Sequence, residues 1–291
     1  MKWPSFDTWH VAHGRSLPLA DGVLMAIINV TPDSFSDGGM LAGTDAAVAH
    51  ALDCIAAGAH IVDIGGESTK PGAEEVSAEV EQARVLPVIR ELRRRTDALI
   101  SIDTYRASTA RLAIEAGAHI VNDVHGAQRE SEIATVAAAT GAGLCLMHTG
   151  RGREKLADVI EDQFLFLRRS LEIADAAGVE RARIVLDPGF GFAKDADENI
   201  ELMTRFAELH AFGLPLLAGT SRKRFIGAMT GEEAADRRDP GTAATTVYLR
   251  QQGAALFRVH NVAINRDALA VANAILVMEA KCLSRKPDLN S

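Results

Sequence analysis

Eight short apolar runs in this 291-residue chain end in or beside a polar side chain that could do chemistry. Carboxylates, amides, imidazoles and amines bind metal ions and anions, hydrogen-bond heterocycles and carry protons. In a parallel α/β barrel the carboxyl ends of the strands meet at one mouth, so these residues would converge there from distant parts of the chain. The run-end residues are Asn29, Asp63, Asp103, Asn122, His148, Asp187, Ser221 with Lys223, and His260.

Two carboxylates and one amide of this set suit a flat heterocycle. Asp103, Asn122 and Asp187 would together face adjacent N–H donors, such as a guanidine-like edge. For any one of them taken alone, the alternative is a strand-end group that only accepts backbone hydrogen bonds. Three such groups in one cavity favour the ligand-binding interpretation.

The motif RVHNV (258–262) is typical of a site for a pyrophosphate. Arg258 and His260 are two residues apart on a predicted strand, so both side chains face the same side. Arginine offers a planar fork of donors and histidine adds one more. The chain has no GxSxG elbow after a strand, which argues against a serine hydrolase.

Two loop motifs could also bind anions. In DIGGESTKPG (63–72) consecutive glycines permit close backbone approach, and Thr69 and Lys70 stand beside them. In GTSRKRFIG (219–227) three basic residues, 222–224, begin a predicted helix. A solvated basic turn is the alternative for this second motif, although loops after strands seven and eight of such barrels often bind anions.

The segment NVTPDSFSDGG (29–39) is too long and too polar for an ordinary strand-to-helix connection, and long loops at a barrel mouth often act as lids. Asn29 and Asp33 offer oxygens suited to Mg²⁺ or to a polar ligand. Phe35 would either cover a flat ring or tuck into the edge of the core.

The elements that must position these residues follow a regular alternation of strands and helices. Each of two similar segments, AAGAHIVDI (56–64) and EAGAHIVND (115–123), predicts a helix end, a glycine cap and a buried strand. This pattern predicts a single (β/α)8 barrel with long loops after strands 1 and 2. A doubly wound sheet fits less well, because polar residues end nearly every strand and no GxGxxG follows the first one. The expected strands are residues 22–30, 59–64, 98–103, 118–123, 143–148, 183–187, 214–220 and 255–260.

The domain organisation that we expect is simple. Residues 22–283 form the barrel, residues 1–21 form an N-terminal extension that caps its floor, and residues 284–291 form a C-terminal tail. Apolar residues make up 47% of the chain and the net charge is −8, without a basic stripe, so no nucleic-acid partner is expected. The lack of a signal segment or a long apolar run predicts a cytoplasmic protein with no membrane contact.

The motifs NVTPDSFSDGG, DIGGESTKPG, SIDTYRASTA, VNDV, DPGFGF, TSRK and RVHNV occur in an order that closely resembles the dihydropteroate synthase family, over roughly residues 22–280. The resemblance implies an enzyme that joins 6-hydroxymethyl-7,8-dihydropterin pyrophosphate to p-aminobenzoate, giving dihydropteroate and pyrophosphate in folate biosynthesis. It also implies a (β/α)8 barrel, a homodimer, a requirement for Mg²⁺ and inhibition by sulfonamides.

The resemblance also assigns roles to individual residues. It implies that Asp103, Asp187, Lys223 and Asp33 are catalytic and that Asn29 contacts Mg²⁺. The pterin would be bound by Asp103, Asn122, Asp187 and Lys223, with Phe192 lining the pocket. The pyrophosphate would be bound by Asn29, Lys70, Arg258 and His260, and p-aminobenzoate would be enclosed by Asp33, Phe35, Thr69, Pro71 and Ser221.

The chain departs from the family pattern at several places. Lys70 stands where arginine is typical, Asn261 where aspartate is usual, and Phe190 where isoleucine is frequent. The segments HGA (125–127) and HTGRGREK (148–155) replace a Gly-Gly ending and an HMQG-type loop. The residues assigned to the pterin are intact, so we expect activity.

Two other functions stay open. A pterin-dependent methyltransferase uses a related barrel, but it should lack the combined TSRK and RVH motifs. A non-catalytic pterin-binding paralogue should have lost charged residues at the mouth, and none is lost here.

Overall fold

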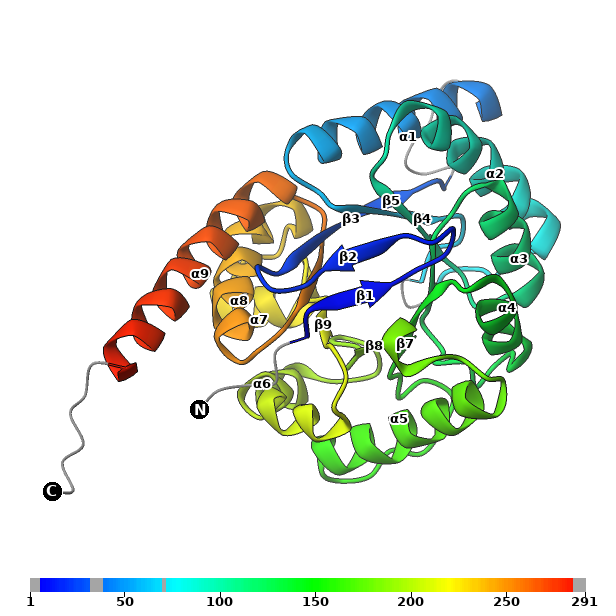
Figure 1. Cartoon of the computed structure of the whole chain (residues 1–291). Helices are drawn as coiled ribbons and strands as arrows, with labels where there is room; N and C mark the ends of the chain where they lie inside the picture. Colours follow the sequence, from blue (N-terminus) through cyan, green and yellow to red (C-terminus); the bar gives the residue numbers. More distant parts are fainter. Residues whose placement is uncertain (1–5, 32–38, 70–71, 285–291) are drawn as a thin grey trace, which may run out of the picture.

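Eight parallel strands form the wall of a barrel in the computed structural model, which describes residues 6–31, 39–69 and 72–284 (Figure 1). Their order around the barrel is β8-β7-β6-β5-β4-β3-β10-β9, and a parallel bridge between Leu186 and Leu216 joins the two ends. This confirms the predicted (β/α)8 fold. The strands are β3 Val23–Asn29, β4 Ile61–Gly65, β5 Leu99–Asp103, β6 Ile120–Asp123, β7 Gly143–Met147, β8 Ile184–Asp187, β9 Leu217–Ala218 and β10 Leu256–Val259.

Helices surround the strands and cover their outer face (Figure 1). A large apolar cluster joins the two layers, with Ile64, Ile100 and Leu144 contributing from the strands. The helices are α1 Gly39–Ala56, α2 Ala78–Arg95, α3 Ala107–Ala116, α4 Glu132–Thr140, α5 Val159–Ala176, α6 Ala196–Thr204, α7 Arg224–Thr230, α8 Asp239–Gln251 and α9 Val262–Ser284, with short 3₁₀ turns η2 Arg181–Arg183, η3 Phe206–Phe212 and η4 Ala235–Arg238.

On several strands the inward side chains change from apolar to polar toward the carboxyl end. On β5, Leu99 belongs to the inner apolar cluster, and Ser101 and Asp103 follow at the two-residue spacing that keeps one face of a strand. On β10, Leu256 lies in the same cluster and Arg258 follows. The amino-terminal half of the interior is therefore a packed core, and the carboxyl-terminal half can hold a polar ligand.

A small hairpin lies across the amino-terminal end of the barrel (Figure 1). Its strands, β1 Thr8–His10 and β2 Ser16–Pro18, pair antiparallel with Trp9 opposite Leu17. Trp9 is fully buried in the inner apolar cluster, and its indole N–H donates to the carbonyl of Arg183 over 2.8 Å. The hairpin thus seals the floor, so the polar chamber opens at the opposite end.

Candidate active site at the carboxyl ends of the strands

Arg258 on β10 organises the polar half of the barrel. Its Nε donates to the Oδ2 of Asp63 on β4 over 2.6 Å, and its Nη2 donates to the Oδ2 of Asp103 on β5 over 2.7 Å. The Nδ2 of Asn122 on β6 donates to the same Asp63 oxygen over 3.1 Å. We call Asp63, Asp103, Asn122, Asp187, Lys223 and Arg258 the mouth cluster.

The carboxylates of the mouth cluster are buried with few partners. Burial raises the pKa of Asp103 to about 7, against the charge of Arg258, and the neighbouring Asp63 adds to the rise. Within the described residues, the second oxygen of Asp63 and the hydroxyl of Ser101 are buried without a hydrogen-bond partner. Such atoms lose hydration without compensation, so the chamber favours a ligand that brings polar groups.

Asp187 and Lys223 face each other across the end of β9. The backbone N–H of Gly189 donates to Asp187 Oδ1 over 2.7 Å, and Lys223 Nζ donates to the carbonyl of Phe190. Burial raises the pKa of Asp187, while burial lowers the pKa of Lys223 to about 7 against the opposing charge of Asp187. Both groups therefore titrate nearer neutrality than usual, which suits a site where charge develops during a reaction. Lys223 Nζ also lies 4.7 Å from the ring centroid of Phe192.

His260 and Ser221 bind each other at the end of β10. The Ser221 hydroxyl accepts from the backbone N–H of His260 over 3.0 Å and lies 2.9 Å from its Nδ1. Burial and the charges of Arg222 and Arg258 lower the pKa of His260 to about 3, so its ring is neutral. In the tautomer that has its proton on Nε2, Ser221 donates to Nδ1. In that tautomer, His260 can offer its Nε2–H to an anion.

The remaining predicted residues lie on the loops. Asn29 ends β3 with an exposed side chain, and Thr69 is half-buried in the loop after β4. The positions predicted for Asp33, Phe35, Lys70 and Pro71 lie outside the described residues.

The basic segment 222–224 combines three different roles. Arg222 makes a two-pronged ion pair with Asp239 (2.7 and 2.8 Å), and Asn261 donates to the same carboxylate over 2.9 Å. Arg222 and the unusual Asn261 therefore fix the start of α8. Lys223 enters the mouth cluster, and Arg224 begins α7 with an exposed side chain.

The sequence assigned no role to His148, and its side chain does not converge with the other run-end residues but makes structural hydrogen bonds. Strand β7 ends at Met147, which packs with Tyr105 and Val124 at the mouth, and side chains alternate along a strand. His148 therefore turns outward and packs against Phe166 of α5, with ring centroids 5.0 Å apart.

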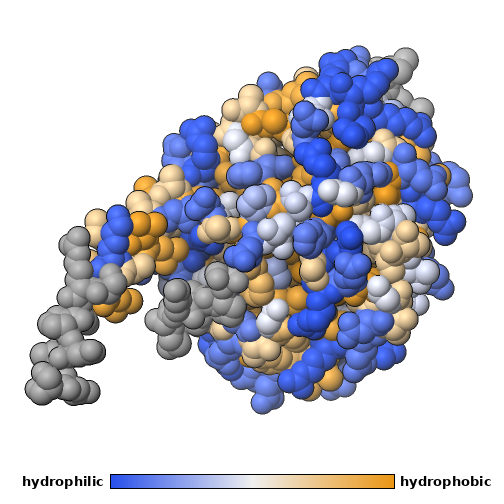
Figure 2. All heavy atoms as spheres, viewed as in Figure 1, coloured by the Kyte–Doolittle hydropathy of each residue, from blue (hydrophilic) through white to orange (hydrophobic). Residues whose placement is uncertain are grey.

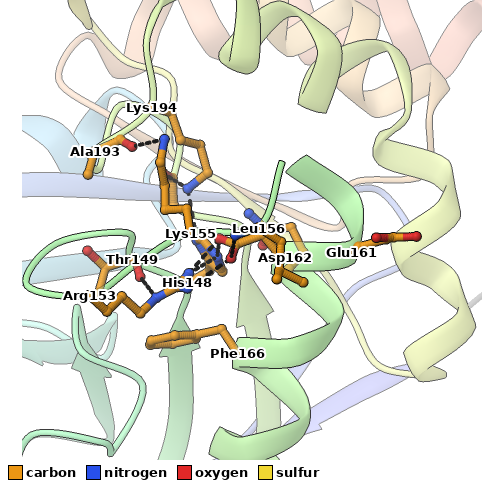
Figure 3. A network of polar contacts seen from close by, with 12 residues as sticks. His148, Thr149, Arg153, Lys155, Leu156, Glu161, Asp162, Phe166, Ala193 and Lys194 are labelled. Carbon is orange, nitrogen blue, oxygen red and sulfur yellow. Dashed lines mark hydrogen bonds and ion pairs between the residues drawn. The ribbon is translucent and has the colours of Figure 1, made fainter. Parts of the chain in front are cut away.

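A closed polar network surrounds His148 (Figure 3). Lys194 Nζ lies 2.9 Å from His148 Nδ1 and donates to the carbonyl of Gly189, also over 2.9 Å. His148 Nε2 lies 3.0 Å from Asp162 Oδ2, and Arg153 donates to both oxygens of Asp162 (2.8 and 2.5 Å). We call His148, Arg153, Asp162 and Lys194 the brace, because Gly189 links it to the turn that holds Asp187.

Sequence reasoning left Asp63 unassigned and missed Lys194. Asp63 lies at an inward position two residues after Ile61, so the two-residue periodicity of β4 was the available signal. Lys194 stands alone in the apolar run GFGFAK, and a buried lysine needs acceptors. Its partners could not be read from sequence, because His148 is 46 residues away.

Comparisons with known proteins identify the family. A family model described as "Pterin binding enzyme" matches residues 25–260. The chain is 45% identical over 261 residues to the dihydropteroate synthase of Bacillus subtilis, covering 89% of this chain and 91% of that protein. The chain belongs to the dihydropteroate synthase family. Its activity is therefore the condensation of the pterin pyrophosphate with p-aminobenzoate to give dihydropteroate.

Solved dihydropteroate synthase structures agree with the fold. The Xanthomonas albilineans dihydropteroate synthase with 4-aminobenzoic acid superposes with a TM-score of 0.88 at 40% identity, covering 92% of this chain and 98% of that one. The Yersinia pestis enzyme in a sulfonamide drug complex gives 0.85 at 39% identity, with 92% and 99% coverage. Among the residues that the structure describes, no helix is long and apolar enough to cross a membrane.

The dihydropteroate synthase family also implies Mg²⁺, and the oxygens at the mouth can be tested against it. A Cβ atom added to Gly65 would lie 3.7 Å from Asp103 Oδ2 and 3.9 Å from Asn29 Oδ1. Both oxygens therefore border the same space beside Gly65. No group of three or more His, Cys, Asp or Glu side chains suited to a metal exists in the described part. Mg²⁺ commonly takes one or two protein oxygens together with phosphate oxygens and water, so this donor set fits it.

Proposed function

We propose that the mouth cluster is the pterin site of a dihydropteroate synthase. The supporting observation is that Asp103, Asn122, Asp187 and Lys223 lie at the carboxyl ends of the barrel strands, where Arg258 and Asp63 link Asp103 to Asn122 and where Asp187 interacts with Lys223. The pterin's guanidine-like edge would donate to the carboxylates, and its carbonyl and ring nitrogens would accept from Lys223 and Asn122. Phe192 would lie beside the bound ring.

We propose that Arg258, His260, Lys70 and Asn29 bind the pyrophosphate. Two N–H groups of Arg258 are engaged by carboxylates, and a guanidinium has five, so others can face the leaving group. The neutral His260 would add its Nε2–H. Mg²⁺ held by Asn29 and the substrate's own oxygens would neutralise negative charge on the pyrophosphate.

The residues favour departure of the leaving group before attack. The aromatic amine of p-aminobenzoate is a weak nucleophile, so early cleavage of the methylene C–O bond, with the electron pair leaving on pyrophosphate, creates a better electrophile. Asp103 and Asp187 would stabilise positive charge on the pterin methylene. The amine then forms the new C–N bond and loses one proton. Loops after β3 and β4 would exclude water, which would otherwise capture the cation.

We propose that Thr69 and Ser221, with Phe35, Pro71 and the catalytic Asp33, enclose p-aminobenzoate, and that sulfonamides bind the same pocket. The Yersinia pestis relative in complex with a sulfonamide drug supports this second part. The cytoplasmic location stays a prediction.

We also propose a homodimer. Val271, Ile275 and Met278 follow one another at helical spacing on the outer face of α9, and they are 55%, 38% and 57% exposed. Figure 2 shows hydrophobic side chains along this projecting helix. A second copy of the chain would cover them, and analytical ultracentrifugation should give twice the monomer mass.

The test of the activity uses purified protein with Mg²⁺, the pterin pyrophosphate and p-aminobenzoate. Equimolar dihydropteroate and pyrophosphate should appear. The absence of both products, with correctly folded protein, would contradict the proposal.

A further inference from the structure

Three successive carbonyls in the turn after β8 each accept a hydrogen bond from a side chain outside the turn. The pairs are Gln163 with Pro188 over 3.0 Å, Lys194 with Gly189 over 2.9 Å, and Lys223 with Phe190. Asp187, at the end of β8, begins this turn. Because buried carbonyls need partners, these side chains set the shape of the turn and the direction in which the Asp187 carboxylate points.

Gly189 connects these contacts to the carboxylate of Asp187. Its N–H donates to Asp187 Oδ1 over 2.7 Å, and its carbonyl accepts from Lys194. The residue has a φ of +65°, and a Cβ atom added to it would lie 1.9 Å from the carbonyl oxygen of His148. The turn thus packs directly on the end of β7, and a shift of Gly189 would move the N–H that orients Asp187.

Lys194 is itself held from two sides. The residue is only 9% exposed, and its Nζ lies 2.9 Å from His148 Nδ1 (Figure 3). In the tautomer that has its proton on Nε2, His148 accepts from Lys194 and donates to Asp162 over 3.0 Å. On the main chain, Asn199 donates to the carbonyl of Lys194 over 3.1 Å and accepts from the N–H of Gly191 over 2.7 Å. Both the ammonium and the backbone of Lys194 are therefore fixed relative to the turn.

Lys194 brings a charge to the turn, whereas the neighbouring carbonyl is bound by the neutral Gln163. A buried ammonium is costly, and burial lowers the pKa of Lys194 to about 7, with the charge of Lys223 acting in the same direction. Burial raises the pKa of Asp187, and the charges that oppose this rise belong to Lys223, Arg258 and Lys194. The charge of Lys194 therefore favours the ionised form of Asp187, which a neutral donor would not do.

We propose that Lys194 is a positioning residue for the reaction, which aims Asp187 at the pterin and keeps its carboxylate ionised without touching the substrate. Gln163 supports the same turn through hydrogen bonding alone. The proposal rests on the proposed function of the mouth cluster and adds to it two residues that act through Asp187. Since Lys194 belongs to the brace, the brace contributes to the chemistry as well as to stability.

The test compares the steady-state kinetics of the wild type, Lys194→Met and Gln163→Leu. Both replacements keep an apolar side chain of similar size but cannot donate to the turn. Per folded molecule, the kcat/KM for the pterin pyrophosphate should fall on the order of 10-fold in Lys194→Met, because a charged hydrogen bond is lost, and about 3-fold in Gln163→Leu. Circular dichroism measures the folded fraction of each variant.

The pH dependence separates the charge of Lys194 from its position. Without that charge the pKa of Asp187 should rise, so the acidic limb of kcat/KM against pH should move to higher pH in Lys194→Met. Gln163→Leu removes no charge, so its acidic limb should coincide with that of the wild type. Lys155→Met is the matched control, because Lys155 donates to the carbonyl of Ala193, beyond the turn, over 2.8 Å. This control should match the wild type in both measurements.

Two results would overturn the positioning role. One is a normal kcat/KM per folded molecule in both Lys194→Met and Gln163→Leu, even with a lowered Tm, since the contacts would then only stabilise the fold. The other is an equal loss in Lys155→Met, because the whole loop would then matter rather than its contact with Gly189. An unshifted acidic limb in Lys194→Met would overturn the role of its charge. Should Lys194→Met not fold, Gln163→Leu decides the question, and an inactive wild type would instead contradict the proposed function itself.

Discussion

The mouth cluster and the brace are two buried charged networks on opposite sides of the strand wall, and they differ in how fully they are hydrogen-bonded. In the brace, Asp162 accepts from Arg153, from the N–H of Leu156 and from His148. Although burial opposes it, these bonds hold the pKa of Asp162 well below its usual range. In the mouth cluster, burial dominates instead and raises the pKa of Asp103.

This difference distinguishes a network that stabilises the fold from one that can bind a ligand. A carboxylate with a full set of donors is fixed in its ionised form and stabilises the fold. A carboxylate with too few donors is kept at a cost to stability, and such groups gather where a ligand completes the network. Burial alone therefore does not identify a functional aspartate; the supply of donors does.

The largest effect should come from removing charge from the mouth cluster. Lys223→Ala and Asp187→Ala should each lower kcat/KM by roughly 10²- to 10³-fold or more, because each removes an electrostatic contact to the reacting pterin. Thermal unfolding should stay close to that of the wild type. Steady-state kinetics and circular dichroism measure both, and near-normal activity in either variant would refute the pterin assignment.

The opposite result is expected in the brace. Asp162→Ala should lower the free energy of unfolding by about 3–5 kcal/mol, because Arg153 and His148 lose a buried partner. Urea denaturation measures this loss. The exposed Asp175→Ala on the same helix is a matched control, with an expected change within about 0.5 kcal/mol. If the two variants unfold alike, the brace does not stabilise the fold.

A smaller effect should appear in the pH dependence of stability. The pKa of Asp103 is raised to about 7 in the folded protein, so the fold binds its proton more tightly than the unfolded chain does. This contribution to stability is present at low pH and falls as the pH rises from about 4 to about 7. Asp103→Asn removes that dependence, so the Tm of the variant minus that of the wild type should increase between pH 5 and pH 8. A constant or decreasing difference would show that Asp103 is not held in this way.

The fold was predictable because barrel strands are continuous apolar runs with clear ends. Seven of the eight expected strands contain the observed ones, and β4 extends one residue further, to Gly65. Each apolar run reflects the burial of its strand, so the strand can be predicted whatever the structure of the loops beside it. The inward direction of Arg258 also followed from periodicity.

Two features could not be predicted from the sequence. One is whether a side chain just beyond a strand points into the barrel or out of it, and the other is which charged side chains pair across the barrel. His148 lies one residue beyond β7, and a shift of one residue changes the face. The pairing of Arg258 with Asp63 joins residues 195 apart and depends on the stagger of the strands.

The hairpin over the barrel floor has a consequence for the traffic of small molecules. The fully buried indole of Trp9 fills the amino-terminal end of the barrel. Small molecules can therefore reach the mouth cluster only from the carboxyl ends of the strands. A ligand bound deeper in the barrel would therefore have to enter before a ligand bound nearer the carboxyl ends of the strands. A tryptophan at the amino-terminal end of the barrel would thus determine the order in which ligands reach the carboxyl-terminal end.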